Sequence, residues 1–375
     1  MPIPWQKYYL WICLAVGLAA AIFLFFYWRG TEAMIQRALD AEKIKIYAGL
    51  EKPPRQNVKA VYLTAYSAGN PKKIDEIISL LKKTELNAVV IDIKDYSGLV
   101  LYDSRLPLVR QLGLKDNRLG NVSALVEKLH RNGVYVIARQ TVFQDPVLAE
   151  KKPEWAVKSK KGGLWRDNKG LAWVDASRPE VWDYNLDIAR EASRFGFDEL
   201  NFDYVRFPSD GPMSEAIFAL NGKKKYEVMG EFFSALSERL ADLPVWLSLD
   251  FFGFTMEKTG FDDMNIGQRL ADALDKVDYI CPMMYPSHYP VGHLGFKNPA
   301  EHPAEVIENG MKMGAAKFRG RRAMLRPWLQ AFDLGAIYDA EKIRAQIDAT
   351  EKSAKAGWLL WNASNRYVDD GLKAE

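Results

Sequence analysis

Residues 197–208 read FDELNFDYVRFP and give the clearest indication of how this chain folds. The first half has the composition of a buried strand. The second half carries Asp203, Tyr204 and Arg206, where a purely structural strand would simply turn. A carboxylate at the C-terminal end of a strand, followed by an arginine and aromatic residues, is typical of an active site on a parallel α/β barrel. Such a barrel would need seven further strands.

Apolar runs rich in β-branched residues alternate with helical patterns from residue 58 onward. The predicted strands cover 58–66, 88–95, 134–141, the start of 197–208, 245–250, 277–285, 322–330 and 357–362. The predicted helices cover 71–84, 122–132, 179–195, 227–240, 263–274, 303–313 and 340–354, with a long loop at 143–178. This alternation predicts an α/β fold, a (β/α)8 TIM barrel. A doubly wound open sheet is the alternative, although no glycine-rich nucleotide loop follows the first strand.

Composition bounds the possible classes of protein. The chain has 375 residues, 48% hydrophobic and 26% charged, which is typical of a globular protein with one large domain or two ordinary ones. The net charge of +3 and the lack of any block of five like charges predict no nucleic-acid partner. Cys13 and Cys281 lie in an apolar N-terminal run and a predicted strand, so no disulfide framework is expected.

The N-terminal run at 8–28, YYLWICLAVGLAAAIFLFFYW, contains no charged residue and is long enough to span a bilayer as a helix. A cleaved signal peptide is the alternative, but bulky aromatic residues follow the small residues at 19–21 where a cleavage site would be expected. We therefore predict a signal anchor at 1–29, a stalk helix at 30–57 and the barrel at 58–370. The protein would be a single-pass membrane protein with an extracytoplasmic catalytic domain.

Asp203 and Asp250 are the candidate catalytic residues. Strand alternation places Asn201 on the face of Asp203, and Trp246 and Ser248 on the face of Asp250. Two carboxylates at the ends of adjacent strands could face one cavity, as glycoside hydrolysis requires. The alternative is an aspartate that caps the turn after its strand.

Further polar and aromatic residues cluster at the other strand ends. Asp92 and Lys94 share a strand face and could form an internal ion pair that orients the site; a structural role is the alternative. Arg139 or Arg206 could hold a carboxylate ionised or bind an acidic sugar. The predicted substrate-binding residues are Tyr66, Asp92, Lys94, Asp95, Arg139, Arg206, Tyr285, Trp328, Gln330, Trp361 and Asn362.

The loop residues leave two questions open. Trp155, Trp165 and Trp173 could stack on sugar rings or pack in the core. His288, His293 and His302 have an irregular spacing that does not match a zinc site, so no metal and no cofactor are predicted.

Five motifs together resemble a bacterial family of glycoside-hydrolase-like TIM barrels, which is distantly similar to the α-amylase-like hydrolases. They are FDELNFDYVRFP, VYLTAYSAG at 61–69, VVIDIKDYSG at 89–98, LSLDFFGF at 247–254 and DYICPMMYPSHY at 278–289. The resemblance covers about residues 57–370 and implies a glycosidase-like barrel.

The α-amylase pattern carries over only in part. It implies Asp203 as nucleophile and, by location, Asp250 as general acid, where α-amylases usually have glutamate. The α-amylase arginine position holds Asn201, and the histidine–aspartate pair of strand seven has no counterpart in 326–330. The resemblance therefore leaves the detailed mechanism open.

The sequence as a whole predicts a membrane-anchored glycoside hydrolase acting on an envelope or extracellular polysaccharide, with a retaining outcome preferred. One alternative is a non-catalytic glycan-binding or envelope scaffold protein on a glycosidase barrel. Another is a metal-dependent hydrolase that uses the loop histidines. The sequence predicts no specific protein partner.

Overall fold

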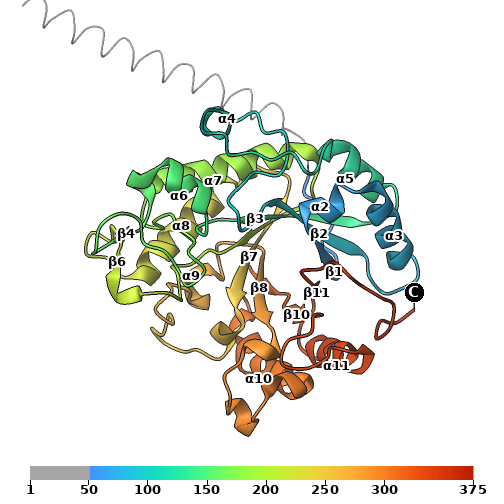
Figure 1. The fold of residues 1–375 in the computed structure, drawn as a ribbon. Coiled ribbons are helices and arrows are strands. Elements are labelled where there is room, and N and C mark those ends of the chain that lie inside the picture. The colour runs from blue at the N-terminus through green and yellow to red at the C-terminus, as the bar shows by residue number, and fades with distance from the viewer. Residues whose placement is uncertain (1–50, 375) are drawn as a thin grey trace, which may run out of the picture. The chain divides into compact units, whose positions relative to one another are not determined.

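Eight parallel strand positions close into a barrel in the computed structural model (Figure 1). The strands are β1 (Val58–Leu63), β2 (Ala88–Lys94), β3 (Tyr135–Thr141), β5 (Glu199–Asp203), β7 (Trp246–Phe252), β8 (Tyr279–Met284), β10 (Trp328–Gln330) and β11 (Gly357–Trp361). The ring closes because β1 pairs with both β2 and β11, and β10 pairs with both β8 and β11. The predicted TIM barrel is confirmed.

The structure describes residues 51–374. The predicted anchor at 8–28 and residues 30–50 of the predicted stalk lie outside this range. From residue 51 to residue 374, no helix is long and apolar enough to cross a membrane. Residues 51–57 contain no helix or strand.

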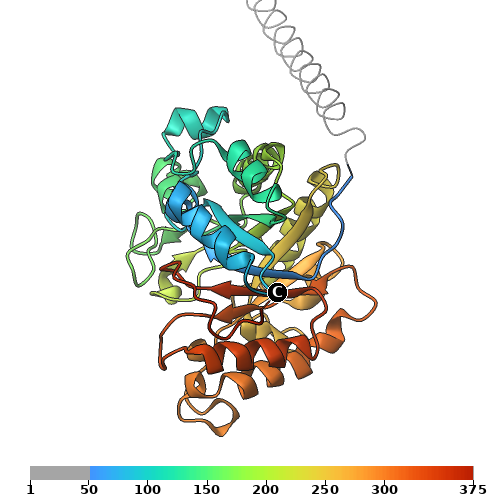
Figure 2. The ribbon, with the colours of Figure 1, turned by 90° about the vertical axis from the view of Figure 1, so that its right-hand side faces the viewer.

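The principal helices form the outer layer of the barrel (Figures 1 and 2). They are α3 (Pro71–Leu81), α5 (Val122–His130), α7 (Pro179–Ala192), α8 (Lys225–Arg239), α10 (Pro303–Gly314) and α11 (Ala340–Glu351). In α3 the stripe of Ile74, Ile77, Ile78 and Leu81 is buried, and the Asn70 side chain accepts a hydrogen bond from the backbone N–H of Lys72. Helix α3 thus begins at its cap and packs through one apolar face.

Shorter elements occupy the connections. The short α-helices are α2 (Ala65–Ala68), α4 (Pro107–Leu112), α6 (Pro146–Lys151) and α9 (Leu270–Ala273). The 3-10 helices are Pro153–Trp155, Ser193–Phe195, Met213–Glu215, Gly253–Met256, Pro286–His288, His293–Gly295, Pro299–Glu301 and Ala315–Phe318. The long loop after β3 contributes β4 (Lys158–Ser159), which pairs antiparallel with β6 (Ala216–Ile217).

Two predicted elements differ from the structure. The predicted strand 322–330 is divided into β9 (Met324–Leu325) and β10, because Pro327 between them has no backbone N–H to donate to a neighbouring strand. The predicted helix 263–274 is reduced to α9. Met264 and Asn265 adopt positive φ angles of 53° and 58°, which are incompatible with a right-handed helix.

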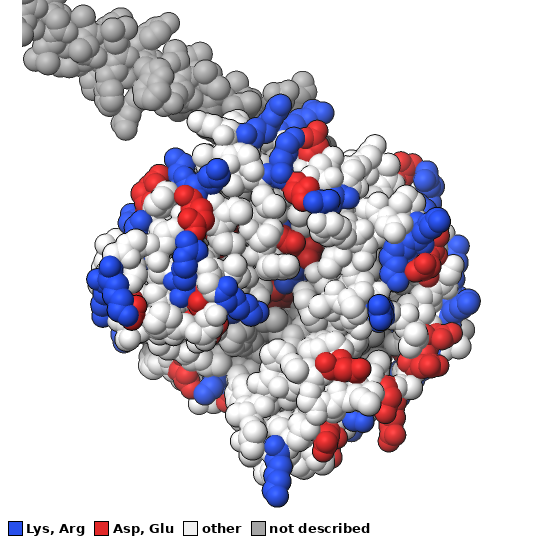
Figure 3. All heavy atoms as spheres, in the orientation of Figure 1, with Lys and Arg blue, Asp and Glu red and all other residues white. Residues whose placement is uncertain are grey.

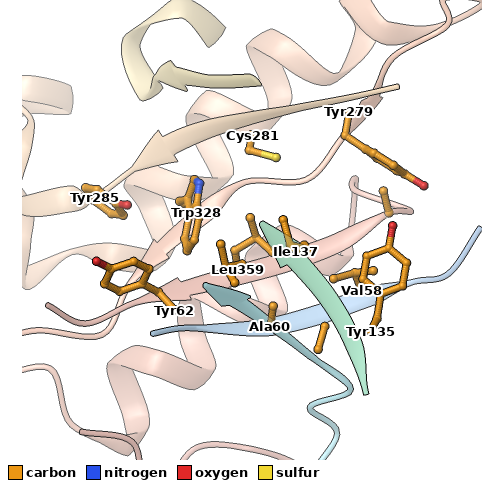
Figure 4. Packing of buried hydrophobic residues seen from close by; sticks show 13 residues of the cluster. Val58, Ala60, Tyr62, Tyr135, Ile137, Tyr279, Cys281, Tyr285, Trp328 and Leu359 are labelled. Carbon is orange, nitrogen blue, oxygen red and sulfur yellow. The ribbon is translucent and has the colours of Figure 1, made fainter. Parts of the chain in front are cut away.

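Inward-facing side chains fill the barrel (Figure 4). The alternate residues Val58, Ala60 and Tyr62 of β1 all belong to this core cluster, as strand alternation requires. At the N-terminal end of the strands, Trp246 donates its indole N–H to the carbonyl oxygen of Pro53 at 2.9 Å. The start of the described chain therefore lies against that end of the barrel. The carboxyl ends of the strands point the other way.

Candidate active site

A cavity of about 390 Å³ lies at the carboxyl ends of the barrel strands. Figure 3 shows a face that is hollowed near its centre, with acidic and basic atoms recessed in the hollow. The residues lining the cavity are Arg139, Asp203, Tyr204, Arg206, Asp250, Phe252, Gly253, Phe254, Met283, Tyr285, His288, Tyr289, Trp328 and Trp361. The predicted catalytic pair, Asp203 and Asp250, therefore shares one cavity.

Asp203 is the last residue of β5, and its side chain is held from two sides. Its Oδ2 accepts a hydrogen bond from Nη2 of Arg139, and its Oδ1 accepts one from the backbone N–H of Tyr204 at 2.5 Å. Tyr204 has a φ of 54°, which is uncommon for a residue with a side chain. The sharp turn at Tyr204 ends the strand and presents Asp203 at the cavity wall.

Asp250 lies on the neighbouring strand β7 and is 1% exposed. Its Oδ1 accepts hydrogen bonds from Asn201 Nδ2 and from Trp328 Nε1, each at 2.8 Å. Burial, together with the nearby charge of Asp203, raises the pKa of Asp250 to about 8, although Arg139 and the two hydrogen bonds act in the opposite direction. Asp250 is thus suited to hold a proton near neutral pH.

Arg139, at the centre of β3, links three carboxylates. Its Nη1 donates to Asp92 at 2.5 Å, its Nη2 donates to Asp203, and its Nε lies 3.7 Å from Oδ2 of Asp250. Burial alone would lower the pKa of Arg139, but the charges of Asp92 and Asp203 outweigh burial and hold the pKa above its ordinary value. The guanidinium therefore stays charged and orients the acidic groups around it.

Asp92 holds Arg139 in place from outside the cavity. It accepts a hydrogen bond from the hydroxyl of Tyr62 at 2.5 Å in addition to the one from Arg139, and it does not line the cavity. Burial raises the pKa of Asp92 to about 6, against the opposing effects of Arg139 and Tyr62. The Tyr62 ring stacks on Trp361 with centroids 3.8 Å apart, so this support extends to an aromatic wall of the cavity.

The expected ion pair between Asp92 and Lys94 is wrong. The register of β2 against β3 shifts between these two residues, and this irregularity turns Lys94 away from the face of Asp92. Lys94 is fully buried, 2.8 Å from Asp145, and donates to the carbonyl oxygen of Thr141 at 2.7 Å. Lys94 therefore lies outside the cavity.

Several predicted substrate-binding residues lie in the cavity wall, namely Arg139, Arg206, Tyr285, Trp328 and Trp361. Others do not. Tyr66 is 63% exposed, Asp95 accepts hydrogen bonds from Ser97 in the turn after β2, and Gln330 accepts one from the backbone N–H of Ser287. Asn362 lines a neighbouring depression of about 740 Å³, which shares Tyr285, His288 and Trp361 with the cavity.

Some residues that line the cavity were not predicted, notably Phe252, Phe254 and Tyr289. The two phenylalanines follow Asp250 within four residues, which is a usable sequence signal. Tyr289 lies on a loop, and nothing in its local pattern indicates that it reaches the cavity. Of the loop tryptophans, Trp165 and Trp173 are buried, which bears out the packing interpretation for those two.

The loop histidines make separate contacts. His302 stacks on Phe296, His293 lies 3.4 Å from Glu257, and His288 lies beside Ser287. Within residues 51–374, no group of three or more histidine, cysteine, aspartate or glutamate residues is arranged to hold a metal ion.

Solved structures share this fold at low sequence identity. The PgaB (BpsB) glycoside hydrolase domain from Bordetella bronchiseptica is 17% identical with a TM-score of 0.56, over 83% of this chain and 94% of that one. Alpha-L-fucosidase isoenzyme 2 from Paenibacillus thiaminolyticus is 13% identical with a TM-score of 0.54, over 84% of this chain and 47% of that one. At these identities the likeness concerns the fold alone.

A hypothetical protein from Ruminiclostridium thermocellum is 42% identical over 51% of this chain and 96% of its own length, with a TM-score of 0.48. No curated protein matches the sequence. The family described as "Putative glycosyl hydrolase domain" matches residues 60–367, most of the barrel, and confirms the resemblance seen in the motifs. The chain belongs to this glycosyl hydrolase family.

Proposed function

We propose that this protein hydrolyses a glycosidic bond, with Asp203 as nucleophile or charge stabiliser and Asp250 as general acid and base. One observation carries the proposal: the two carboxyl groups line the same cavity and contact the same guanidinium, while burial and the charge of Asp203 raise the pKa of Asp250. Two carboxyl groups with different protonation are what this reaction uses.

In the first step, neutral Asp250 gives its proton to the glycosidic oxygen as the bond to the anomeric carbon breaks. Asp203 attacks that carbon, or stabilises its positive charge. Water then adds to the anomeric carbon while the Asp250 carboxylate takes a proton from that water; where Asp203 has formed a bond to the carbon, this bond breaks and the Asp203 carboxylate is released. A retaining outcome is part of the proposal, and the anomeric configuration of the first product formed tests it. Asp250 is favoured over Asp92 as the acid because Asp92 does not line the cavity.

The substrate we propose is a polysaccharide of the cell envelope or of the extracellular medium. The aromatic walls Tyr285, Trp328 and Trp361 suit sugar rings, whose C–H groups lie against aromatic planes. The neighbouring depression shares Tyr285 and Trp361 with the cavity, so a chain of sugars could continue from one to the other. Cleavage within longer oligosaccharides should therefore be faster than cleavage of disaccharides.

Membrane anchoring and an extracytoplasmic catalytic domain form part of the proposal. The uncharged run at 8–28 supports them. Protease treatment of intact spheroplasts provides the test. Digestion of the barrel domain without lysis would agree with the proposal, and protection until lysis would contradict it.

The decisive experiment combines hydrolysis with binding. The wild-type protein is incubated with a panel of polysaccharides, and newly formed reducing ends are measured. Asp203→Asn should lower the rate on any substrate found by at least 10³-fold while the affinity for that substrate stays within a few fold. Unchanged hydrolysis by this variant would overturn the assignment.

A non-catalytic glycan-binding protein is the second candidate. Two departures from the α-amylase pattern favour it: Asn201 stands at the arginine position, and residues 326–330 contain no histidine–aspartate pair. Saturable binding to a glycan by the wild-type protein, without new reducing ends after prolonged incubation, would select this function.

A further inference from the structure

Arg206 differs from every other buried cation in the described part of the chain. Lys94 pairs with Asp145, Arg139 with Asp92 and Asp203, and Arg326 with Glu199. Arg206 is only 7% exposed, yet within residues 51–374 no carboxylate lies at ion-pair distance from it, and those of Asp203, Asp210 and Asp167 act on it only from further away. A buried charge without a direct counter-ion is costly, so its retention here favours a ligand that supplies an anionic partner.

The contacts of Arg206 leave one edge of its guanidinium open. Its Nη1 donates to the carbonyl oxygen of Phe207 at 3.0 Å and lies 3.3 Å from the hydroxyl of Ser209. An arginine carries five N–H donors, and those on Nε and Nη2 have no acceptor among the described residues. The Nε–Nη2 edge forms the fork that binds a carboxylate through two parallel hydrogen bonds.

Aromatic rings fix the position of this fork. The guanidinium carbon lies 4.6 Å from the ring centroid of Phe252, 5.1 Å from that of Trp173 and 5.2 Å from that of Tyr204. These rings stabilise the cation but cannot neutralise it. Because Arg206 lines the cavity that contains Asp203 and Asp250, a group bound to its fork would belong to the molecule in that cavity.

We propose that Arg206 is the recognition site for an anionic substituent of the substrate, the carboxylate of a uronic acid being the group whose planar shape fits the open edge. The proposal deepens the function above and rests on the cavity being a sugar site. It names acidic polysaccharides as the substrate class. Burial lowers the pKa of Arg206, and a bound carboxylate would remove part of that penalty.

Matched ligands test this on the intact wild-type protein. The dissociation constants of glucuronan and cello-oligosaccharides, mannuronate and manno-oligosaccharides, and oligogalacturonate and its methyl ester are measured by calorimetry at low salt. A sulfated and unsulfated chondroitin pair, whose members both carry the uronate carboxylate, shows whether a sulfate ester is bound instead. In at least one of the first three pairs the acidic member should bind at least tenfold more tightly, and 0.5 M NaCl should reduce this preference. A preference confined to the sulfated chondroitin would contradict the assignment of a carboxylate. Equal or weaker binding of every acidic member, including no binding at all, would overturn the proposal.

Variants of Arg206 then test whether this side chain causes the preference for acidic sugars. Arg206→Gln should abolish the difference within the preferred pair, whereas Arg206→Lys should restore part of it because lysine keeps the charge but lacks the fork. Arg319→Gln, at an exposed arginine, is the matched control and should leave the difference unchanged. A preference that survives intact in folded Arg206→Gln would contradict the proposal. If that variant does not fold, the ligand pairs on the wild type decide.

The proposal and the glycosidase function can fail separately. Hydrolysis that depends on Asp203 but shows no preference for acidic sugars would remove the role of Arg206 and leave the reaction. Selective binding of an acidic sugar through Arg206 without any hydrolysis would keep the binding role and remove the reaction.

Discussion

Removal of Arg139 should destabilise the barrel in a way that depends on pH. In Arg139→Met, a side chain of similar reach replaces the guanidinium, and Asp92 and Asp203 lose their direct cationic partner. Asp250 loses a weaker contact at 3.7 Å. All three carboxyl groups are at most 4% exposed, so solvent cannot replace the lost interactions.

Breaking a buried ion pair by removing one partner costs about 3–5 kcal/mol. Since two carboxylates lose a direct bond, we expect a loss in the free energy of unfolding of about 5 kcal/mol at pH 8. Burial already raises the pKa values of Asp92 and Asp250, and without Arg139 both would rise further above the unfolded value of about 4. The folded state then binds more protons than the unfolded state, so stability falls as pH rises above that unfolded value. The deficit should therefore be largest at pH 8 and smallest near pH 5.

Thermal and urea unfolding of the wild type and the variant at pH 5 and pH 8 measure this effect. Arg326→Met is the matched control, because it removes the partner of buried Glu199 at the opposite end of the barrel and should cost about 3–5 kcal/mol without altering the cavity. A loss below 1 kcal/mol in Arg139→Met at pH 8, or an equal loss at both pH values, would refute the reasoning.

Three further predictions follow from individual contacts. Lys94→Met should lower the free energy of unfolding by about 3–5 kcal/mol, because buried Asp145 loses its cationic partner, while the affinity for a glycan should stay within twofold. A tenfold loss of affinity would show that Lys94 does belong to the binding site. Trp361→Ala should weaken glycan binding roughly tenfold, or about 1.4 kcal/mol by calorimetry, and Trp361→Phe should recover much of this loss. Equal affinities of the wild type and Trp361→Ala would exclude a contact between the indole and a sugar ring. The rate of hydrolysis should fall as pH rises through about 8, since Asp250 must carry a proton; a flat pH profile from 6 to 10 would contradict this.

Strand alternation made most of the fold, and the placement of Asp203 and Asp250, predictable. It depends only on a period of two residues, so the placement of Asn201 and Asp203 on the inner face of β5 follows from sequence. The same period failed for Lys94, because the shift in register after Asp92 is not visible in a single strand. Pro327 marks the break between β9 and β10, which the apolar pattern alone conceals.

Contacts between strands were harder to foresee. The role of Arg139 depends on β3 lying between β2 and β5, in a register that aligns Arg139 with Asp92 on one side and Asn201 on the other. Tyr62 reaches Asp92 from β1 in the same manner. Such contacts are set by the closure of the whole barrel, so a motif within one strand cannot reveal them.

The assignment of Asp203 and Asp250 is tested most directly by the effect of the leaving group on hydrolysis. A dinitrophenyl glycoside of the preferred sugar needs no protonation of its leaving group, whereas an oligosaccharide does. In Asp250→Asn, kcat/KM for the dinitrophenyl glycoside, which reports cleavage of the bond to the leaving group, should stay close to wild type, whereas kcat/KM for the oligosaccharide should fall about 10²–10⁴-fold. Asp203→Asn should lose activity on both substrates. Equal losses on the two substrates in Asp250→Asn, or full activity in Asp203→Asn, would contradict the assigned roles.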